Sequence, residues 1–220
     1  MKRGKTLKPL QVKYIEHIPA VSHRGLILAR LGYRRGVTEL CGDYRQFVDR
    51  AIKDALILCH LRGAYGCCDI VGRGPNQVTL ENGTIFTSEK LASFLKDSEG
   101  AVLMAVTAGH EVYDKISGLM GEGDGALGVI YDSVASQVTD SALDWLMDFL
   151  NKTIGVKGRV LTRRRFSPGY GDLLLSNQKI IYDLLDLSRI DVAITESFML
   201  LPEKTVIAIA GIGAVTSDQR

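Results

Sequence analysis

The segment Ala101-Val102-Leu103-Met104-Ala105-Val106-Thr107 is an almost wholly apolar run of strand length that follows a glycine, Gly100. Strands exposed on one face alternate apolar and polar residues, whereas strands covered on both faces are apolar throughout. The run therefore predicts a buried strand in the centre of a β-sheet.

A hairpin signal precedes this strand and indicates how the sheet is built. Gln77 to Glu81 and Thr84 to Phe86 are joined by Asn82-Gly83, a dipeptide that favours a tight turn between antiparallel strands. Other segments with strand-like patterns are Val12 to Ile18, Ala64 to Val71, Arg159 to Arg165, Ile190 to Thr195 and Thr205 to Ile212.

Helical spacing of apolar residues separates these strands. The longest predicted helix is Ala126 to Asn151, with Ile130, Val134, Val138, Ala142, Trp145 and Phe149 as its buried face. Because strands and helices follow one another as hairpins and helix pairs, we expect an α+β fold, mainly an antiparallel twisted sheet with flanking helices, in a single domain, 1–220. The other predicted helices run from a Ser22 cap to Gly32, from Tyr44 to Leu61 after a region opened by Gly36, from Thr87 or Ser88 towards Gly100, from Val112 to Met120, and from a Ser176 cap through Leu185.

The long helix carries an acidic face. Asp140, Asp144 and Asp148 recur every four residues with no lysine or arginine between them. Such a row is usually a solvated surface, and a cationic ligand or partner would relieve its repulsion.

Composition excludes several classes of function. The 220 residues carry a formal net charge of only +2, which argues against a nucleic-acid partner. No apolar run is long enough to span a membrane, and the basic segment Met1 to Lys8 is not followed by the apolar region of a signal peptide. We therefore expect a cytoplasmic protein without a membrane partner.

The four cysteines are expected to be reduced, buried thiols. A zinc site on Cys67 and Cys68 is a weaker alternative, because neighbouring residues of a strand point to opposite faces and no further ligands follow at metal spacing. No metal site is expected. The glycine-rich stretch between Gly118 and Gly128 lacks phosphate-binding spacing and predicts a helix-to-helix connection.

The segment Arg165-Phe166-Ser167-Pro168-Gly169-Tyr170-Gly171-Asp172 is the candidate ligand site. Proline and two glycines predict a sharp bend, the guanidinium suits a carboxylate, and the tyrosine offers a stacking face. The same residues also fit a surface β-turn between a strand and a helix.

The first six residues of this segment resemble the Arg-x-x-x-Gly-Tyr signature of the activation domain of cobalamin-dependent methionine synthase. Three further segments resemble that family in the same order along the chain. They are Ala105-Val106-Thr107-Ala108-Gly109, the acidic helix, and Thr195-Glu196-Ser197-Phe198 with Pro202.

The resemblance implies that the chain binds S-adenosylmethionine. Arg165 would pair with the methionine carboxylate, the backbone at Ser167 and Gly169 would hold the ligand, Tyr170 would border the site, and Asp144 would correspond to a family glutamate. It also implies docking on a separate cobalamin-binding methionine synthase chain, with cobalamin reached only through that partner and an electron donor such as a flavodoxin-like protein. No residue would be catalytic, so the chain would be a component of a methyltransferase without chemistry of its own.

Several departures from the family pattern leave an alternative open. Gly171-Asp172-Leu173 stands where the family has Pro-Ala-Cys, and Asp172 would repel a ligand carboxylate; Arg159 falls near a family glutamate. The cobalamin-binding signature D-x-H-x-x-G does not occur, which implies a reactivation module made as a separate polypeptide. The alternative is an interaction subunit of a cobalamin protein that has lost S-adenosylmethionine binding.

Overall fold

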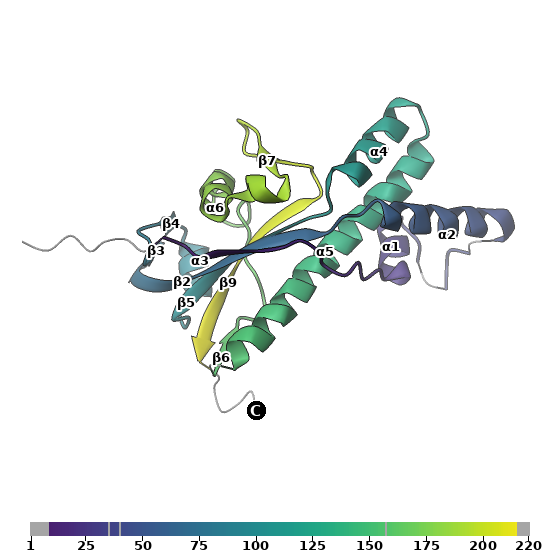
Figure 1. The fold of residues 1–220 in the computed structure, drawn as a ribbon. Coiled ribbons are helices and arrows are strands. Elements are labelled where there is room, and N and C mark those ends of the chain that lie inside the picture. The colour runs from purple at the N-terminus through teal and green to yellow at the C-terminus, as the bar shows by residue number, and fades with distance from the viewer. Residues whose placement is uncertain (1–8, 35, 40, 157, 215–220) are drawn as a thin grey trace, which may run out of the picture.

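The fold is seen in a computed structural model that describes residues 9–34, 36–39, 41–156 and 158–214 (Figure 1). The basic segment Met1 to Lys8 lies outside the described residues. The single domain over residues 1–220 stays a prediction.

An antiparallel sheet forms the centre of the molecule. Its order is β4-β3-β2-β5-β9-β6, and β1 pairs with the first half of β2 on the same side as β3. The predicted α+β class and the central position of β5 are confirmed. The strands are β1 (Val12–Ile15), β2 (Arg62–Gly74), β3 (Gln77–Leu80), β4 (Ile85–Thr87), β5 (Gly100–Thr107), β6 (Arg159–Leu161) and β9 (Thr205–Ala214).

Helices cover both faces of this sheet. The long helix α5 crosses one face, and α1, α2 and α4 pack around its first half, whereas α3, α6, a 3-10 helix and the small β7-β8 hairpin lie on the other face (Figure 1). Their bounds are α1 (Arg24–Arg30), α2 (Gly42–Ile57), α3 (Glu89–Phe94), α4 (His110–Gly121), α5 (Gly125–Gly155), α6 (Asn177–Leu185), the 3-10 helix (Leu187–Ile190), β7 (Ala193–Ile194) and β8 (Leu200–Leu201).

The apolar run of β5 supplies both cores. Because successive strand residues point to opposite faces, Val102, Met104 and Val106 pack with α5, while Leu103 and Ala105 pack with α3 and α6. Every residue of β5 is buried. The two cores together explain why this segment has no polar alternation.

Several predicted ends and faces are wrong. His23, rather than Ser22, precedes α1, and its carbonyl accepts the N–H groups of the first turn. Gly36 opens no helix, since α2 begins at Gly42 and ends at Ile57. Ser176 precedes α6 without forming a side-chain cap.

The buried face of α5 also differs from the prediction near its end. Phe149 is 37% exposed, and the helix buries Leu143, Leu146 and Leu150 instead. Trp145 is only partly buried and stacks on Phe149, with ring centroids 5.4 Å apart. The buried face shifts around the helix axis along α5, because the first half of α5 packs on other helices and its second half packs on the sheet.

The predicted strand Arg159 to Arg165 stops at Leu161. Beyond it, the Thr162 hydroxyl accepts the N–H of Gly211 at 3.0 Å and donates to the Arg164 carbonyl at 2.8 Å. The side chain thus takes a position that a strand backbone would occupy. The Thr162 N–H still donates to the Gly211 carbonyl at 2.9 Å, and the next backbone contacts with β9 are the two hydrogen bonds between Phe166 and Ile209.

Gly211 of β9 lies where no side chain fits. An added Cβ would lie 2.0 Å from Ser98 Oγ, 3.0 Å from Ser98 Cβ and 2.9 Å from Thr162 Cγ2. We expect Gly211→Ala to lower the free energy of unfolding by about 1–3 kcal/mol, because buried Ser98 must move, as measured by urea denaturation.

Gly118→Ala on α4 is the matched control. Nothing lies within 4 Å of a Cβ built there, so this change should leave stability unchanged or raise it slightly. Equal denaturation midpoints for the two variants would contradict the packing argument.

Candidate functional site

A sharp bend follows β6 and carries the predicted ligand motif. The Tyr170 N–H donates to the Ser167 carbonyl at 3.2 Å, and the Gly169 N–H donates to the Leu173 carbonyl at 2.8 Å. Gly169 has a φ of 91° and Gly171 a φ of 61°, a region that favours glycine. The predicted bend is confirmed.

Asp172 ties this bend to the start of α3. Its carboxylate accepts hydrogen bonds from Ser88 Oγ at 2.5 Å and from the N–H groups of Glu89 at 2.6 Å and Lys90 at 3.3 Å. Ser88 Oγ in turn caps α3 by accepting the Leu91 N–H at 2.9 Å. Asp172 therefore has a structural role, because it holds the bend against α3. It does not line the neighbouring cleft, so its negative charge would not repel the carboxylate of a ligand there.

The environment lowers the pKa of Asp172 from its ordinary value, mainly through the hydrogen bond from the Ser88 hydroxyl, while desolvation acts in the opposite direction and the N–H groups of Glu89 and Lys90 lower the pKa further. Because the pKa is lower in the folded chain, the carboxylate stabilises the fold above the unfolded pKa, and this stabilisation is lost as the pH falls through the folded pKa.

Asp172→Asn should therefore be less stable than the natural chain at neutral pH and should lose less further stability on acidification. Thermal unfolding midpoints measured from about pH 6 down to about pH 2.5 would test this. Asp97→Asn is the control, since Asp97 is 87% exposed and its cation partner Lys96 lies at 4.0 Å. Parallel curves for Asp172→Asn and the natural chain would contradict the assignment.

A cleft of about 310 Å³ opens beside the bend. It brings together three of the predicted site residues, Arg165, Ser167 and Tyr170, and the Tyr170 side chain is 69% exposed. The other lining residues are Pro168 of the bend, Asp140 of α5, Gln178 of α6, and Thr205, Val206 and Ile207 of β9.

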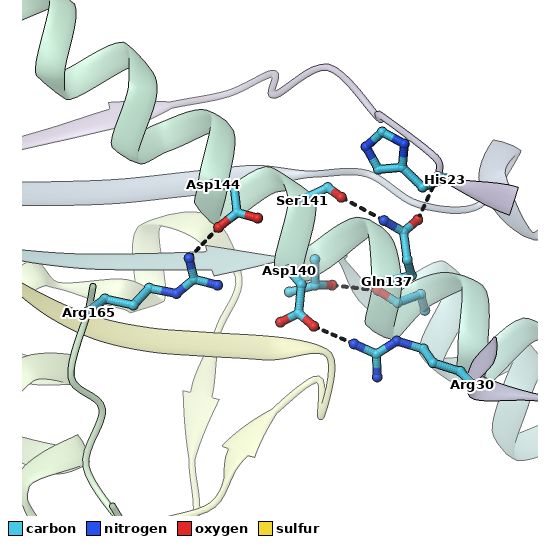
Figure 2. Close-up of polar contacts among 9 residues, drawn as sticks. His23, Arg30, Gln137, Asp140, Ser141, Asp144 and Arg165 are labelled. Atoms are coloured by element: carbon cyan, nitrogen blue, oxygen red, sulfur yellow. Dashed lines mark hydrogen bonds and ion pairs between the residues drawn. The ribbon is translucent and has the colours of Figure 1, made fainter. Parts of the chain in front are cut away.

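Two predicted site residues do not line this cleft. Gly169 shapes the bend, and a Cβ there would lie 3.3 Å from Leu175. Asp144 instead forms an ion pair with Arg165, as Figure 2 shows. The two residues expected to hold opposite groups of a ligand thus contact each other.

The acidic face of α5 is neutralised by cations from distant segments. Arg165 pairs with Asp144, and Arg30 of α1 pairs with Asp140 on the next turn (Figure 2). Asp148 forms no ion pair within the described part of the chain. A cationic ligand or partner is therefore not needed to relieve the repulsion between Asp140 and Asp144.

A buried amide fixes α1 beside this region. The Gln137 side chain accepts the His23 N–H at 3.1 Å and donates to Ser141 Oγ at 2.7 Å (Figure 2). Gln137 is only 2% exposed. Because an amide is costly to bury without partners, these bonds hold the start of α1 against α5. The ion pair of Arg30 with Asp140 holds the other end of α1.

The cleft has the chemistry of a binding site. Arg165 presents a guanidinium that is only partly used, since one nitrogen contacts Asp144 while a forked donor can serve more than one acceptor. Asp140 and Asp144 supply negative charge close to it. Neither histidine, cysteine nor lysine is among the described lining residues.

Sequence reasoning missed Gln178 and the three β9 residues of the cleft. The sequence places Gln178 in a predicted helix, and it predicts only a strand for Thr205, Val206 and Ile207. Their part in the site depends on contacts across the fold and leaves no local signal. Asp140, by contrast, was identified from the sequence as part of the acidic face, but nothing in the sequence indicated that it lines the cleft.

The cysteines are only partly as predicted. Cys59 and Cys68 are buried, and burial raises the pKa of Cys59 to about 12; Cys41 and Cys67 are exposed, so the prediction of buried thiols is wrong for these two. Cys67 and Cys68 do lie on opposite faces of β2. Within the described ranges no three histidine, cysteine or acidic side chains gather as a metal site.

The sheet and the long helix across it form an α+β fold of the kind seen in a solved reactivation domain. The structure is similar to the crystal structure of the MetH reactivation domain bound to AdoHcy, with a TM-score of 0.63 and 14% sequence identity, covering 94% of this chain and 80% of that one. Comparisons with models of protein families and with curated proteins find no match. None of the described helices is both long and apolar enough to span a membrane.

Proposed function

We propose that the protein binds S-adenosylmethionine in the Arg165 cleft and presents it to a cobalamin held by a separate methionine synthase chain. The observation that carries the proposal is the cleft itself, where the Arg165 guanidinium, paired with Asp144, shares the lining with Asp140, on a fold similar to that of a domain solved with AdoHcy. AdoHcy is what remains of S-adenosylmethionine after its methyl group has left.

The charges of the cleft complement those of the ligand. The carboxylate of S-adenosylmethionine takes the free donors of Arg165, and its ammonium and sulfonium groups lie near Asp140 and Asp144. Tyr170, with its exposed ring, borders the adenosine part. Ser167 contributes its backbone from the bend that Gly169 shapes.

The protein's contribution is positioning and exclusion of water rather than acid-base or nucleophilic catalysis. An external one-electron donor, such as a flavodoxin-like protein, would supply the electron that reductive methylation of the partner's cob(II)alamin needs, and S-adenosylmethionine would supply the methyl group and leave as AdoHcy. The partner chain supplies the cobalamin. The reaction takes place in the cytoplasm.

Two measurements test this proposal. Isothermal titration of the purified chain with S-adenosylmethionine and with AdoHcy should give saturable heat. In a reconstituted assay, cob(II)alamin should accumulate on the partner during turnover unless this chain, the methyl donor and the reductant are all present. Absence of binding with and without the partner, or equal accumulation when the chain is omitted, would reject it.

One observation favours the alternative of an interaction subunit without ligand binding. Arg165 and Asp144, the two groups assigned to the ligand, form an ion pair with each other. An ion pair of this kind has a structural role even where no ligand binds. The Arg165 variant described in the Discussion separates the two functions.

A further inference from the structure

A second cavity, of about 410 Å³, lies where α1, the following loop and α2 meet. It shares no lining residue with the Arg165 cleft. Three arginines line it: Arg24 from α1, Arg34 from the loop and Arg45 from α2. Three separate segments therefore bring like charges to one hollow, although the chain as a whole is almost neutral.

This charge is largely uncompensated. Arg24 pairs with Asp49 at 2.7 Å. Arg34 and Arg45 form no ion pair with any residue in the described ranges, and no carboxylate is among the described lining residues. Since like charges gathered in one hollow repel one another, an anion placed between them would be stabilised.

The loop that carries Arg34 has a defined turn. The Thr38 N–H donates to the Arg34 carbonyl at 2.9 Å, and the Arg34 N–H donates to Thr38 Oγ1 at 3.2 Å. The Tyr33 N–H donates to the Leu28 carbonyl of α1 at 2.9 Å, which ties the loop to that helix. The backbone at Arg34 is therefore held before any ligand arrives.

An aromatic surface adjoins the arginines. Tyr33 also lines a neighbouring cavity of about 380 Å³, together with Tyr44 of α2 and apolar residues of α5. Tyr44 is 52% exposed and stacks on Phe47, with ring centroids 6.0 Å apart. Exposed aromatic rings beside guanidinium groups suit a ligand with both a flat ring and several negative charges.

We propose that this second site binds a small nucleotide with two or more phosphate groups. Arg24, Arg34 and Arg45 hold the phosphates, and Tyr33 with Tyr44 takes the base. S-adenosylmethionine does not fit this site, because its ammonium and sulfonium outnumber its one carboxylate. The inference is independent of the function proposed for the Arg165 cleft.

Isothermal titration with ADP, pyrophosphate and adenosine at low salt tests this inference. We expect saturable binding of ADP, weaker binding of pyrophosphate and the weakest of adenosine, with affinity falling as salt is added. Arg34→Gln and Arg45→Gln should each weaken ADP binding by roughly tenfold or more, since each removes a charge-assisted contact to phosphate. Tyr33→Leu should reduce the difference in affinity between ADP and pyrophosphate, because it removes a ring that contacts the base.

Arg50→Gln is the matched control, because Arg50 is an exposed arginine of the same helix that does not line the cavity. Circular dichroism checks that each variant is folded, and Arg165→Ala should bind ADP as the natural chain does. The proposal is overturned if ADP does not bind, if Arg50→Gln weakens binding as much as Arg45→Gln, or if single-stranded RNA binds and ADP does not compete with it.

Discussion

Arg165→Ala is expected to weaken binding of S-adenosylmethionine by roughly ten- to a hundredfold, which corresponds to the loss of about 1.5–3 kcal/mol for a hydrogen bond to a charged group. The substitution removes the only cation among the described lining residues of the cleft and leaves Asp144 without its partner. Isothermal titration with S-adenosylmethionine and AdoHcy measures the change. The affinity of Arg165→Lys for S-adenosylmethionine should lie between those of the natural chain and Arg165→Ala, because lysine keeps the positive charge and lacks the forked guanidinium.

Arg24→Ala is the control for this titration. Arg24 also forms one exposed ion pair with an aspartate, yet it lies outside the Arg165 cleft. Its loss should leave S-adenosylmethionine binding unchanged. If Arg165→Ala bound the ligand as well as the natural chain, the interaction-subunit alternative would be favoured.

Leu103→Ala should lower the free energy of unfolding by about 2–5 kcal/mol, a large effect for a single change in the sheet. Leu103 has no exposed surface and packs in the core between β5, α3 and α6. Truncation removes apolar contacts and leaves a cavity that the paired strands on either side cannot close. For a domain of ordinary stability this loss is a large fraction of the total.

Denaturation in guanidinium chloride, followed by circular dichroism, measures this change. Leu174→Ala is the control, because Leu174 is 69% exposed and its truncation should alter stability by no more than about 0.5 kcal/mol. Similar midpoints for the two variants would contradict the placement of β5 at the centre of the fold.

The elements were predictable from the sequence where the signal is local. Asn82-Gly83 forms the predicted hairpin between β3 and β4, and Ser88, one of two candidates, caps α3. The glycine-rich stretch connects α4 to α5 as expected. The predictions are wrong where a contact with a distant segment determines the local structure. At Thr162, for example, the side-chain hydroxyl accepts a hydrogen bond from Gly211 of β9, and the predicted strand ends there.

The candidate site was predictable only in part. The bend at Gly169 follows from proline and glycine chemistry, and Arg165 and Tyr170 lie at the cleft beside it. Nothing local indicates that Asp172 anchors α3, since its partners lie more than eighty residues away in the chain. The ligand roles assigned to Arg165, Ser167, Gly169, Tyr170 and Asp144 stay predictions.

The amino-acid sequence by itself determined the antiparallel sheet, its buried central strand, the long helix and the glycine bend, because hydrophobic periodicity and backbone restrictions act between near neighbours. Only the tertiary structure decided that Arg165 meets Asp144, that Arg30 meets Asp140, and that three arginines gather around a second cavity. The physical reason is that these pairings depend on how helices pack across a sheet, and charged side chains at the surface leave no periodic signal for their partners.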